Sequence, residues 1–369
     1  MNTAPFEIFL VATPGLEVPL ADEARAARFG EARVTDGGVS FAGTWPDVWR
    51  ANLVIRGATR ILARVASFRA MHLAQLDKRA RKVPWAELLR ADVPVHVEAS
   101  CRRSRIYHAG AAAQRVATAI REELGAPIAE DAALRVMVRI EDDLVTISLD
   151  TTGESLHKRG FKEGVAKAPM RETMAAMFLA QCGYTGTEPV LDPMCGSGTF
   201  VIEAAEIALG LNPGRSRSFA FESLPGFDPD AWAKLRAPSP AVKTGLRFFG
   251  SDRDAGAIRM ATENAVRSGV EACTQFEQKP IEDLTPPQGP PGLVIVNPPY
   301  GTRIGAKGPL IGVHRTLGTV LKTRFAGWRV GIITADKQLA QATGLKFEPA
   351  LPPVLHGGIR VGLYRTAPL

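Results

Sequence analysis

An apolar stretch of the chain ends in the motif NPPY at residues 297–300. Proline has a fixed backbone angle and no N–H donor, so the motif predicts a rigid turn just beyond a strand. The side-chain oxygen of Asn297 and the carbonyl oxygen of Pro298 would then be two acceptors that face one way, which suits a planar NH2 group. Tyr300 can stack on the ring that bears this amine. The motif therefore predicts an amine-modifying site with Asn297, Pro298 and Tyr300 as catalytic residues; a turn without chemistry is the alternative.

A glycine turn lies upstream, in the motif DPMCGSGT at residues 192–199. A short apolar stretch precedes it and a helical one follows, which is the nucleotide-binding arrangement of a doubly wound sheet. Glycine has no Cβ, so the turn lets a ligand approach the backbone closely. The motif lacks the full dinucleotide fingerprint and the lysine of a phosphate-binding loop, so a structural turn is the alternative. Asp192, at the strand end, suits a ligand with an ammonium group. The cofactor-binding residues predicted here are Asp192, Pro193, Cys195, Gly196, Gly198 and Thr199.

A third motif, GSDRD at residues 250–254, ends another apolar stretch. A carboxylate at the tip of the second strand of such a sheet is placed to accept hydrogen bonds from two ribose hydroxyls. We assign this role to Asp252 and keep Asp254 as the alternative. Either carboxylate can instead cap the helix expected to begin near Ala255, and for Asp254 capping is the favoured interpretation.

Strand-like and helical stretches alternate from Arg171 onward, which predicts a doubly wound, mainly parallel sheet. Residues 211–244, rich in proline, serine and arginine, interrupt this alternation as an insertion. The expected strands are Pro189–Leu191, Leu246–Ser251, Cys273–Gln278, Leu293–Val296, Trp328–Thr334 and Ile359–Arg365. The expected helices include Thr199–Leu209 and Ala255–Ser268.

The part before residue 165 mixes short strands and amphipathic helices, as small α+β domains do. Residues 151–170 are polar, basic and glycine-containing, and we interpret them as a linker. The expected strands are Phe6–Ala12, Gly38–Ala42, Val93–Ser100, Leu134–Ile140 and Leu144–Leu149. The expected helices are Gly15–Arg28 and Ala109–Leu124.

Composition and charge limit the classes of protein to consider. Hydrophobic residues make up 46% of the 369 residues and charged ones 22%, which is typical of a soluble globular protein of two or three domains. No apolar stretch approaches the ~20 residues that span a bilayer, and the N-terminus lacks a signal-peptide pattern, so we expect a cytoplasmic protein. The four cysteines are scattered without metal-ligand spacing, so neither disulfides nor a metal site is predicted.

The net charge is +7, and residues 51–170 are the most basic part. Their tight clusters could neutralise a phosphate backbone, and a solvated helix face is the alternative. These clusters are Lys78, Arg79, Arg81 and Lys82, and then Arg102, Arg103 and Arg105.

The three motifs together resemble the signature of class I methyltransferases that methylate amines with S-adenosylmethionine. Residues 149–176 resemble the linker and domain entry of THUMP-containing RNA methyltransferases, and residues 6–24 and 37–43 are similar to the ferredoxin-like N-terminal domain of that family. The resemblance covers nearly the whole chain and is strongest between residues 151 and 305. It implies a ferredoxin-like domain at 1–54, a THUMP domain at 55–152, a linker at 153–170 and a Rossmann-like methyltransferase domain at 171–369.

The resemblance further implies methyl transfer to the exocyclic N2 of a guanine in structured RNA. Within the family, the members that act on 23S ribosomal RNA are the most similar. The resemblance also implies that residues 55–170 bind the RNA. Where the family often has an aspartate after the third strand, this sequence has Pro280. Asp283 is our choice for the adenine contact, with Glu282 or a backbone amide as alternatives. A transfer RNA substrate, methylation of DNA adenine or of a protein glutamine, and a non-catalytic RNA-binding assembly factor remain as rival functions. A covalent role for Cys195 is disfavoured because the residue lies within the glycine turn.

Overall fold

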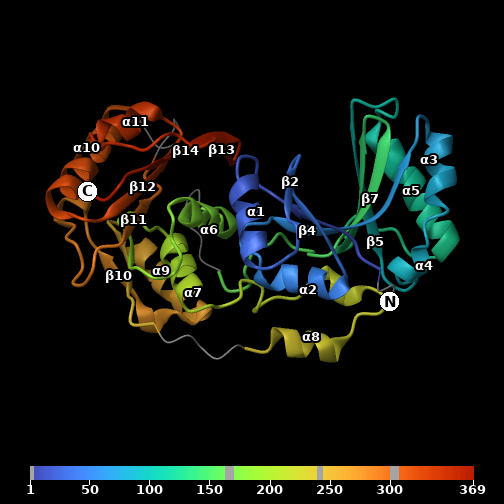
Figure 1. Ribbon diagram of the computed structural model, residues 1–369, viewed down its shortest axis with the longest axis horizontal. Coiled ribbons are helices and arrows are strands. Elements are labelled where there is room, and N and C mark those ends of the chain that lie inside the picture. The colour runs from blue at the N-terminus through green and yellow to red at the C-terminus, as the bar shows by residue number, and fades with distance from the viewer. Residues whose placement is uncertain (1–3, 163–169, 239–243, 300–306) are drawn as a thin grey trace. The chain divides into compact units, whose positions relative to one another are not determined.

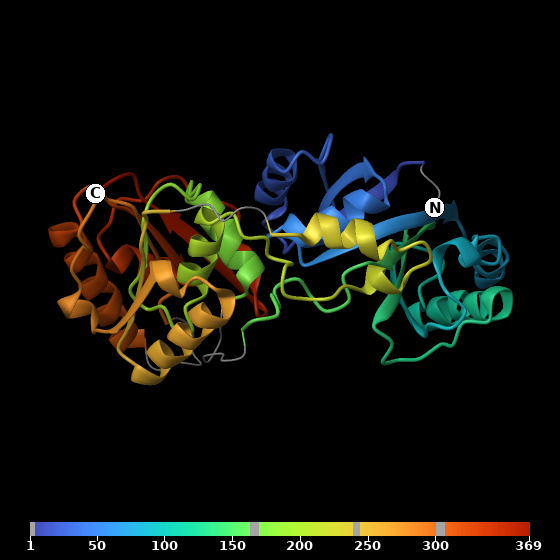
Figure 2. The same ribbon diagram turned by 90° about the horizontal axis from the view of Figure 1, so that it is seen from below.

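The computed structural model describes residues 4–162, 170–238, 244–299 and 307–369. The chain forms two compact units. In Figures 1 and 2 the colour follows the residue number from blue to red. The N-terminal unit consists of Met1–Ala12, Leu20–Leu156 and Arg217–Ala237. The C-terminal unit consists of Thr13–Pro19, His157–Ser216 and Pro238–Leu369. Each unit is built on a seven-stranded sheet of its own.

The first half of the N-terminal unit has the β-α-β-β-α-β order. Its strands form the sheet order β2-β3-β1-β4, and β1 is antiparallel to both of its neighbours, as in ferredoxin-like folds. Because β4 completes this order, the ferredoxin-like part extends beyond residue 54, the boundary expected from the sequence. The elements are β1 (Phe6–Val11), α1 (Glu17–Ala26), β2 (Arg33–Thr35), β3 (Gly38–Gly43), α2 (Trp45–Val54) and β4 (Arg60–Arg69).

The same sheet continues from β4 into the second half of the unit, in the order β4-β7-β6-β5. Helix α5 begins and ends where the sequence predicts, because His108 caps its start and Gly125, at φ +82°, ends it in the left-handed region. The elements are α3 (Leu73–Ala80), α4 (Trp85–Leu88), β5 (Val95–Arg102), α5 (Ala109–Leu124), β6 (Leu134–Glu141) and β7 (Leu144–Asp150).

The segment Arg217–Ala237, part of the predicted insertion, belongs to the N-terminal unit. It carries the short helix η1 (Ala220–Ser223) and α8 (Pro229–Arg236). Its aromatic rings pack against Trp49 of α2: the Phe221 ring stacks at a centroid distance of 6.1 Å, and the Phe227 ring meets Trp49 edge-on at 5.6 Å. Trp232 completes the cluster against Phe221.

The C-terminal unit is a doubly wound α/β fold with the strand order β10-β9-β8-β11-β12-β14-β13. Its first five strands run parallel, and β14 is antiparallel to β12. The prediction of a doubly wound sheet is confirmed; the short strand β13 was not foreseen. The strands are β8 (Val190–Asp192), β9 (Phe248–Asp252), β10 (Thr274–Gln278), β11 (Leu293–Val296), β12 (Arg329–Thr334), β13 (Val354–His356) and β14 (Ile359–Arg365).

Helices cover both faces of this sheet (Figure 1). Helices α10 and α11 lie on one face, and α6, α7 and α9 on the other. On the α10 face, Leu317, Leu321 and Phe325 are fully buried against sheet residues such as Val294 and Ile332. None of the helices in the described ranges is long and apolar enough to cross a membrane. The helices are α6 (Glu172–Gln181), α7 (Thr199–Ala208), α9 (Ala255–Ser268), α10 (Lys307–Arg324), α11 (Lys337–Ala342), and the short η2 (Glu271–Cys273) and η3 (Ile281–Asp283).

Candidate active site

The described residues of the three predicted motifs lie at the carboxyl edge of the C-terminal sheet, where the strand order reverses between β8 and β11. Ligands of open α/β sheets bind at such a switch point. In the pairing register Val294 lies opposite Leu191, so Asn297, three residues further along β11, comes level with the glycine turn. Asp252 ends β9, the neighbour of β8 on the other side. The three sequence motifs are therefore adjacent in space.

The glycine turn adopts the conformation that its residue types predict. Gly196 and Gly198 have φ angles of +52° and +84°, which side chains with a Cβ rarely adopt. A Cβ on Gly198 would also lie 3.1 Å from the Ala261 side chain and 3.2 Å from the Phe276 ring. Helix α7 begins directly after this glycine, so its first N–H groups face the turn.

Two carboxylates flank the turn. Asp192 is 2% exposed, and its Oδ1 accepts a hydrogen bond from the Met194 N–H at 3.0 Å. Asp252 accepts one from the Gly196 N–H at 3.0 Å through Oδ2 and another from the Asp254 N–H at 3.0 Å through Oδ1. Neither forms an ion pair with a described residue. Two carboxylates in this position favour a ligand that carries positive charge.

The electrostatics of Asp192 point the same way. Burial raises the pKa of Asp192 to about 8; the Met194 N–H opposes this rise, and the Asp252 carboxylate adds to it. A cation bound beside Asp192 would relieve the unfavourable energy of its buried charge and lower its pKa again. The burial of the Asp192 carboxylate therefore favours binding of a cationic ligand.

Asp254 has a different role from Asp252. It is the N-cap residue of α9, and its Oδ1 accepts a hydrogen bond from the Gly256 N–H at 2.7 Å. This outcome confirms the interpretation of Asp254 as a helix cap. Asp252, whose carboxylate reaches the glycine turn, is the carboxylate positioned to meet a ligand there.

Cys195 packs between the turn and the neighbouring strand. A Cβ on Gly250 would lie 3.0 Å from the Cys195 sulfur and 2.6 Å from the Phe276 ring, so Gly250 admits both neighbours. Burial, together with Asp192 and Asp252, raises the pKa of Cys195 well above its ordinary value. The side chain is therefore a protonated, packed thiol, which argues against nucleophilic chemistry.

Asn297 presents a buried acceptor. Its Oδ1 is shielded from solvent and has no hydrogen-bond partner among the described residues. Buried amide oxygens are normally paired, so this one, at the carboxyl end of β11, is available as an acceptor for a donor from outside the described residues. Pro298 is buried. Tyr300, the third predicted catalytic residue, lies outside the described residues.

Asp283 lies on η3, in the segment that follows β10, and is exposed. Arg324 donates hydrogen bonds to the carbonyls of Glu282 and Leu284, 2.8 Å each, and so fixes the backbone on both sides of Asp283. The assignment of Asp283 to the adenine contact stays a prediction.

Three residues that sequence reasoning missed hold the site in place. Asn264 of α9 donates a hydrogen bond to the Ser197 carbonyl at 3.1 Å, and Arg267 donates to Asn264 at 2.6 Å and to the Phe161 carbonyl at 2.9 Å. Lys162 donates to the Thr199 hydroxyl at 2.8 Å and pairs with Glu172 at 2.8 Å. These residues come from segments distant in sequence. Only the polar face of α9 and the basic linker could have drawn attention to them.

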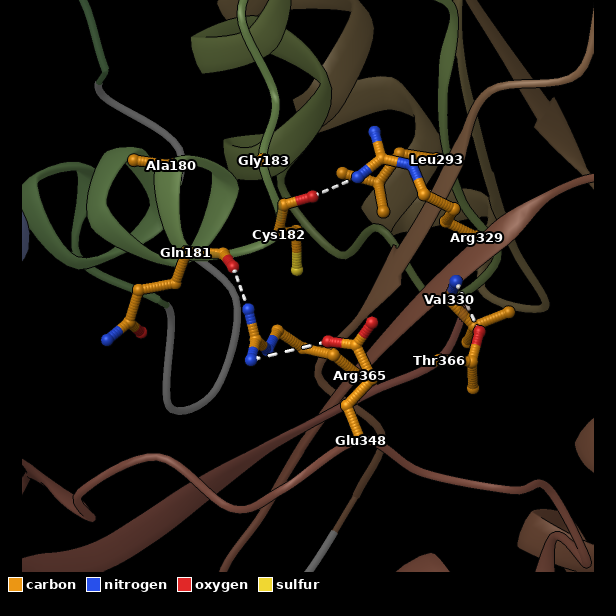
Figure 3. A pocket seen from close by; sticks show the side chains of 10 residues that line it. All are labelled: Ala180, Gln181, Cys182, Gly183, Leu293, Arg329, Val330, Glu348, Arg365 and Thr366. Atoms are coloured by element: carbon orange, nitrogen blue, oxygen red, sulfur yellow. Dashed lines mark hydrogen bonds and ion pairs between the residues drawn. The ribbon is translucent and has the colours of Figure 1, made fainter. Parts of the chain in front are cut away.

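The opposite, amino edge of the same sheet contains a cavity of about 230 Å³ (Figure 3). Arg329 donates to the Cys182 carbonyl and pairs with Glu188. Arg365 donates to the Gln181 carbonyl at 2.7 Å and pairs with Glu348 at 3.3 Å. Each guanidinium that lines the cavity is thus matched by a carboxylate, and none of the predicted site residues lies there. In the described ranges, no group of His, Cys, Asp and Glu side chains is arranged to hold a metal ion.

The strand order, the glycine turn and the carboxylate after the second strand define a class I methyltransferase domain. The model of the RMKL-like methyltransferase domain family matches residues 159–350, and that of the RlmL ferredoxin-like domain matches residues 7–62. The chain belongs to the RMKL-like methyltransferase family.

Relatives and solved structures agree with this assignment. The chain is 36% identical over 363 residues to the ribosomal RNA large subunit methyltransferase K/L of Syntrophotalea carbinolica, covering 93% of this chain and 51% of that protein. The Vibrio campbellii protein of the same name is 31% identical over 344 residues, or 89% and 49% of the two chains. The chain thus spans about half the length of the curated relatives it matches.

Among the crystal structures that match nearly the full length of this chain are the following two. SMU.472, complexed with SAH, has a TM-score of 0.89 at 26% identity and 99% coverage of both chains. A predicted N6-adenine-specific DNA methylase from Listeria monocytogenes has a TM-score of 0.87 at 28% identity, with 99% and 97% coverage. Both support the architecture described above.

Proposed function

We propose that the chain transfers a methyl group from S-adenosylmethionine to the exocyclic N2 of a guanine in RNA, with 23S ribosomal RNA as the favoured substrate. The observation that carries this proposal is the buried Oδ1 of Asn297, level with the glycine turn, to which no described residue donates a hydrogen bond. A hydrogen-bond acceptor in that position can hold the amine of the substrate close to the methyl donor. Positioning of this kind supplies much of the acceleration in a transfer between two bound groups.

The residues present fit S-adenosylmethionine, which supplies an activated methyl group on a positively charged sulfur when bound. Asp192 would meet its ammonium group, and Asp252 the ribose hydroxyls. Both oxygens of Asp252 accept a backbone N–H yet keep lone pairs for two further donors. Pro193, Gly196, Gly198 and Thr199 would line the approach of the cofactor.

On the substrate side, Asn297 and the Pro298 carbonyl would hold the two amine protons, and Tyr300 would stack on the base. A base inside a helix cannot reach such a pocket, so the target nucleotide must be extruded from its stack. No strong general base is needed, because the amine proton becomes acidic once the nitrogen is alkylated.

The proposal of RNA as partner rests on the names of the relatives, on the ferredoxin-like match and on the basic character of residues 55–170. The resemblance gives a THUMP domain at residues 55–152; because β4 completes the ferredoxin-like strand order, we propose that this domain begins after β4. Since ribosomal RNA is the proposed substrate, we also propose a cytoplasmic location. Transfer RNA is the second candidate. The name of the Listeria structure favours DNA adenine as the main rival, since an Asn-Pro-Pro-Tyr motif suits that amine too.

The test uses methyl-labelled S-adenosylmethionine, total RNA from a strain that lacks the protein, and a DNA sample in parallel. Label in N2-methylguanosine of the large ribosomal RNA, absent with the Asn297→Ala variant, is the expected result. The same nucleoside in transfer RNA would keep the chemistry and change the substrate. Label in DNA adenine, or no label despite cofactor binding, would overturn the proposal.

A further inference from the structure

Residues 157–162 belong to the stretch that the sequence predicts as a linker, yet by their contacts they are part of the C-terminal unit. Arg159 forms an ion pair at 3.2 Å with Glu203 of α7, and both side chains are 1% exposed. Further along, the carbonyl of Phe161 accepts a hydrogen bond from Arg267 of α9 at 2.9 Å. The segment is therefore held against the methyltransferase domain by two of its helices.

Lys162 is the last described residue of this segment, and its ammonium group connects the segment to two helix starts. It donates a hydrogen bond to the Thr199 hydroxyl at 2.8 Å and forms an ion pair with Glu172, also at 2.8 Å. Thr199 begins α7 and Glu172 begins α6, and the two helices lie side by side (Figure 1). The Lys162 and Glu172 side chains are only 10% and 8% exposed, so this ammonium group is fixed by its partners.

The contact with Lys162 determines which way the Thr199 hydroxyl group points. An ammonium group can only donate hydrogen bonds, so the Thr199 oxygen is the acceptor and its own proton is directed away from Lys162. No described residue accepts that proton. Because Thr199 is the first residue of α7, its hydroxyl group lies beside N–H groups that have no acceptor within the helix. These O–H and N–H donors are presented together to an acceptor of a ligand.

The chemistry of the cofactor supplies such an acceptor. S-adenosylmethionine carries a carboxylate on the same carbon atom as the ammonium group that Asp192 would meet. Asp192 ends β8 and Thr199 begins α7, so the two residues stand at the two ends of the glycine turn. A carboxylate forms charge-assisted hydrogen bonds with donors at the start of a helix. The two ends of the turn therefore suit the two opposite charges of one amino-acid group.

Other contacts hold the glycine turn in a different way. Asn264 donates a hydrogen bond to the Ser197 carbonyl at 3.1 Å, and the Gly196 N–H donates to Asp252 at 3.0 Å. Both contacts hold the backbone of the turn, whereas Lys162 contacts the side chain of a predicted cofactor-binding residue. Loss of the Lys162 ammonium group is therefore expected to change a ligand contact more than the shape of the turn.

We propose that Lys162 is a positioning residue for the cofactor: it fixes the Thr199 hydroxyl group so that this group donates a hydrogen bond to the cofactor carboxylate. The proposal rests on a part of the proposed function, the placement of the cofactor ammonium group at Asp192. Lys162 acts through Thr199 and does not itself touch the cofactor. A residue of the linker thus contributes to cofactor affinity, although it lies outside the three sequence motifs.

Calorimetric titration of the full chain with two ligands tests this role. S-adenosylhomocysteine carries the carboxylate, and 5′-methylthioadenosine lacks the whole amino-acid group. Lys162→Met is expected to weaken binding of S-adenosylhomocysteine about tenfold, the effect of one hydrogen bond to a charged group, and to leave the Kd of methylthioadenosine unchanged. Equal losses for both ligands would mean that Lys162 only supports the fold, and these losses, or no loss for either ligand, would overturn the proposal.

Two further variants separate the hydroxyl contact from the ion pair. Lys162→Met removes the cationic partner of Glu172, so the double variant Lys162→Met with Glu172→Gln removes both charges and guards against misfolding of the single variant. It should show the same tenfold loss for S-adenosylhomocysteine. Glu172→Gln alone keeps the contact between Lys162 and Thr199 and should bind both ligands as the wild type does. A loss in Glu172→Gln as large as that in Lys162→Met would overturn the proposal in favour of the ion pair.

A double-variant cycle tests whether Lys162 acts through Thr199. Thr199→Val keeps the shape of the side chain without its hydroxyl group, so adding Lys162→Met should weaken S-adenosylhomocysteine binding no further; additive losses would overturn the proposal. Lys322→Met, which removes a donor to the Gly344 carbonyl from α10, is the matched control and should bind as the wild type does. A wild-type protein that binds neither ligand would overturn the cofactor placement as well.

Discussion

The two edges of the methyltransferase sheet use charge in opposite ways. At the amino edge, Arg329 and Arg365 each face a carboxylate, so the polar groups there mainly stabilise the fold. At the carboxyl edge, Asp192 and Asp252 face no described cation, and the Asn297 oxygen has no described donor. A buried group that is left unpaired destabilises the protein alone and becomes favourable only with a ligand. Within one sheet, therefore, the paired polar groups at the amino edge stabilise the fold, and those without a described partner at the carboxyl edge are available to a ligand.

The largest effect is expected at Asn297. Asn297→Ala removes the side-chain acceptor for the amine and should lower kcat for methyl transfer about a hundredfold or more, while the cofactor Kd stays unchanged. Single-turnover kinetics and calorimetry measure the two quantities. Since no described residue donates to this acceptor, the variant should unfold at no lower denaturant concentration than the wild type. A large loss of stability instead would make Asn297 a structural residue.

The next effect concerns the carboxylates. Asp192→Asn removes the charge that would meet the cofactor ammonium and should weaken S-adenosylmethionine binding about tenfold or more. The matched control is Asp254→Asn, which changes a carboxylate two residues beyond Asp252 but keeps a good N-cap residue. Calorimetry should find the control within error of wild type. Equal losses in both variants would mean that overall negative charge, rather than position, determines affinity.

The raised pKa of Asp192 predicts a pH dependence of stability. Its folded pKa of about 8 exceeds the ordinary value of 3.8, so the folded protein holds a proton that the unfolded chain releases between these values. The contribution of Asp192 to stability is therefore present below about pH 4 and is lost as the pH rises towards 8. Urea unfolding of wild type and Asp192→Asn across this interval should show a stability difference in favour of the variant that grows with pH. A constant difference would refute the raised pKa.

The smallest effect is expected at the amino edge. Arg329→Gln leaves Glu188 without its partner and should lower the free energy of unfolding by about 1–3 kcal/mol, with kcat and the cofactor Kd unchanged. The double variant Glu188→Gln with Arg329→Gln should lose less than the two single variants together, because no charge is left unpaired. A change in cofactor affinity would show that the two edges are coupled.

Much of the methyltransferase fold follows from local sequence. The limits of β11, β14 and α9 agree with the predictions because apolar stretches are bounded there by glycine, proline or a capping aspartate. β13 was missed because three residues are too few to show a period. β2, also of three residues, was missed for the same reason. β4 was missed because its partners β1 and β7 lie far along the chain, and pairing, rather than local composition, defines it.

The candidate site divides in the same way. Residues that would meet the ligand, such as Asp192, Asp252 and Asn297, lie in contiguous motifs whose residue types reveal the chemistry. Residues that support them, such as Asn264 and Lys162, act through hydrogen bonds to distant segments. No local pattern encodes such a bond.

The path of the chain between its units has a consequence for dissection of the protein. Because Arg217–Ala237 belongs to the N-terminal unit although it interrupts the methyltransferase sequence, the two units are interleaved in the gene. A fragment beginning at His157 would carry Phe221 and Phe227 without the Trp49 ring that packs against them. A protease that cuts once near residue 156 would leave two pieces that still share one aromatic core. Recombination between two related genes at that point would separate Arg217–Ala237 from the rest of the N-terminal unit. The two units are therefore expected to be inherited together.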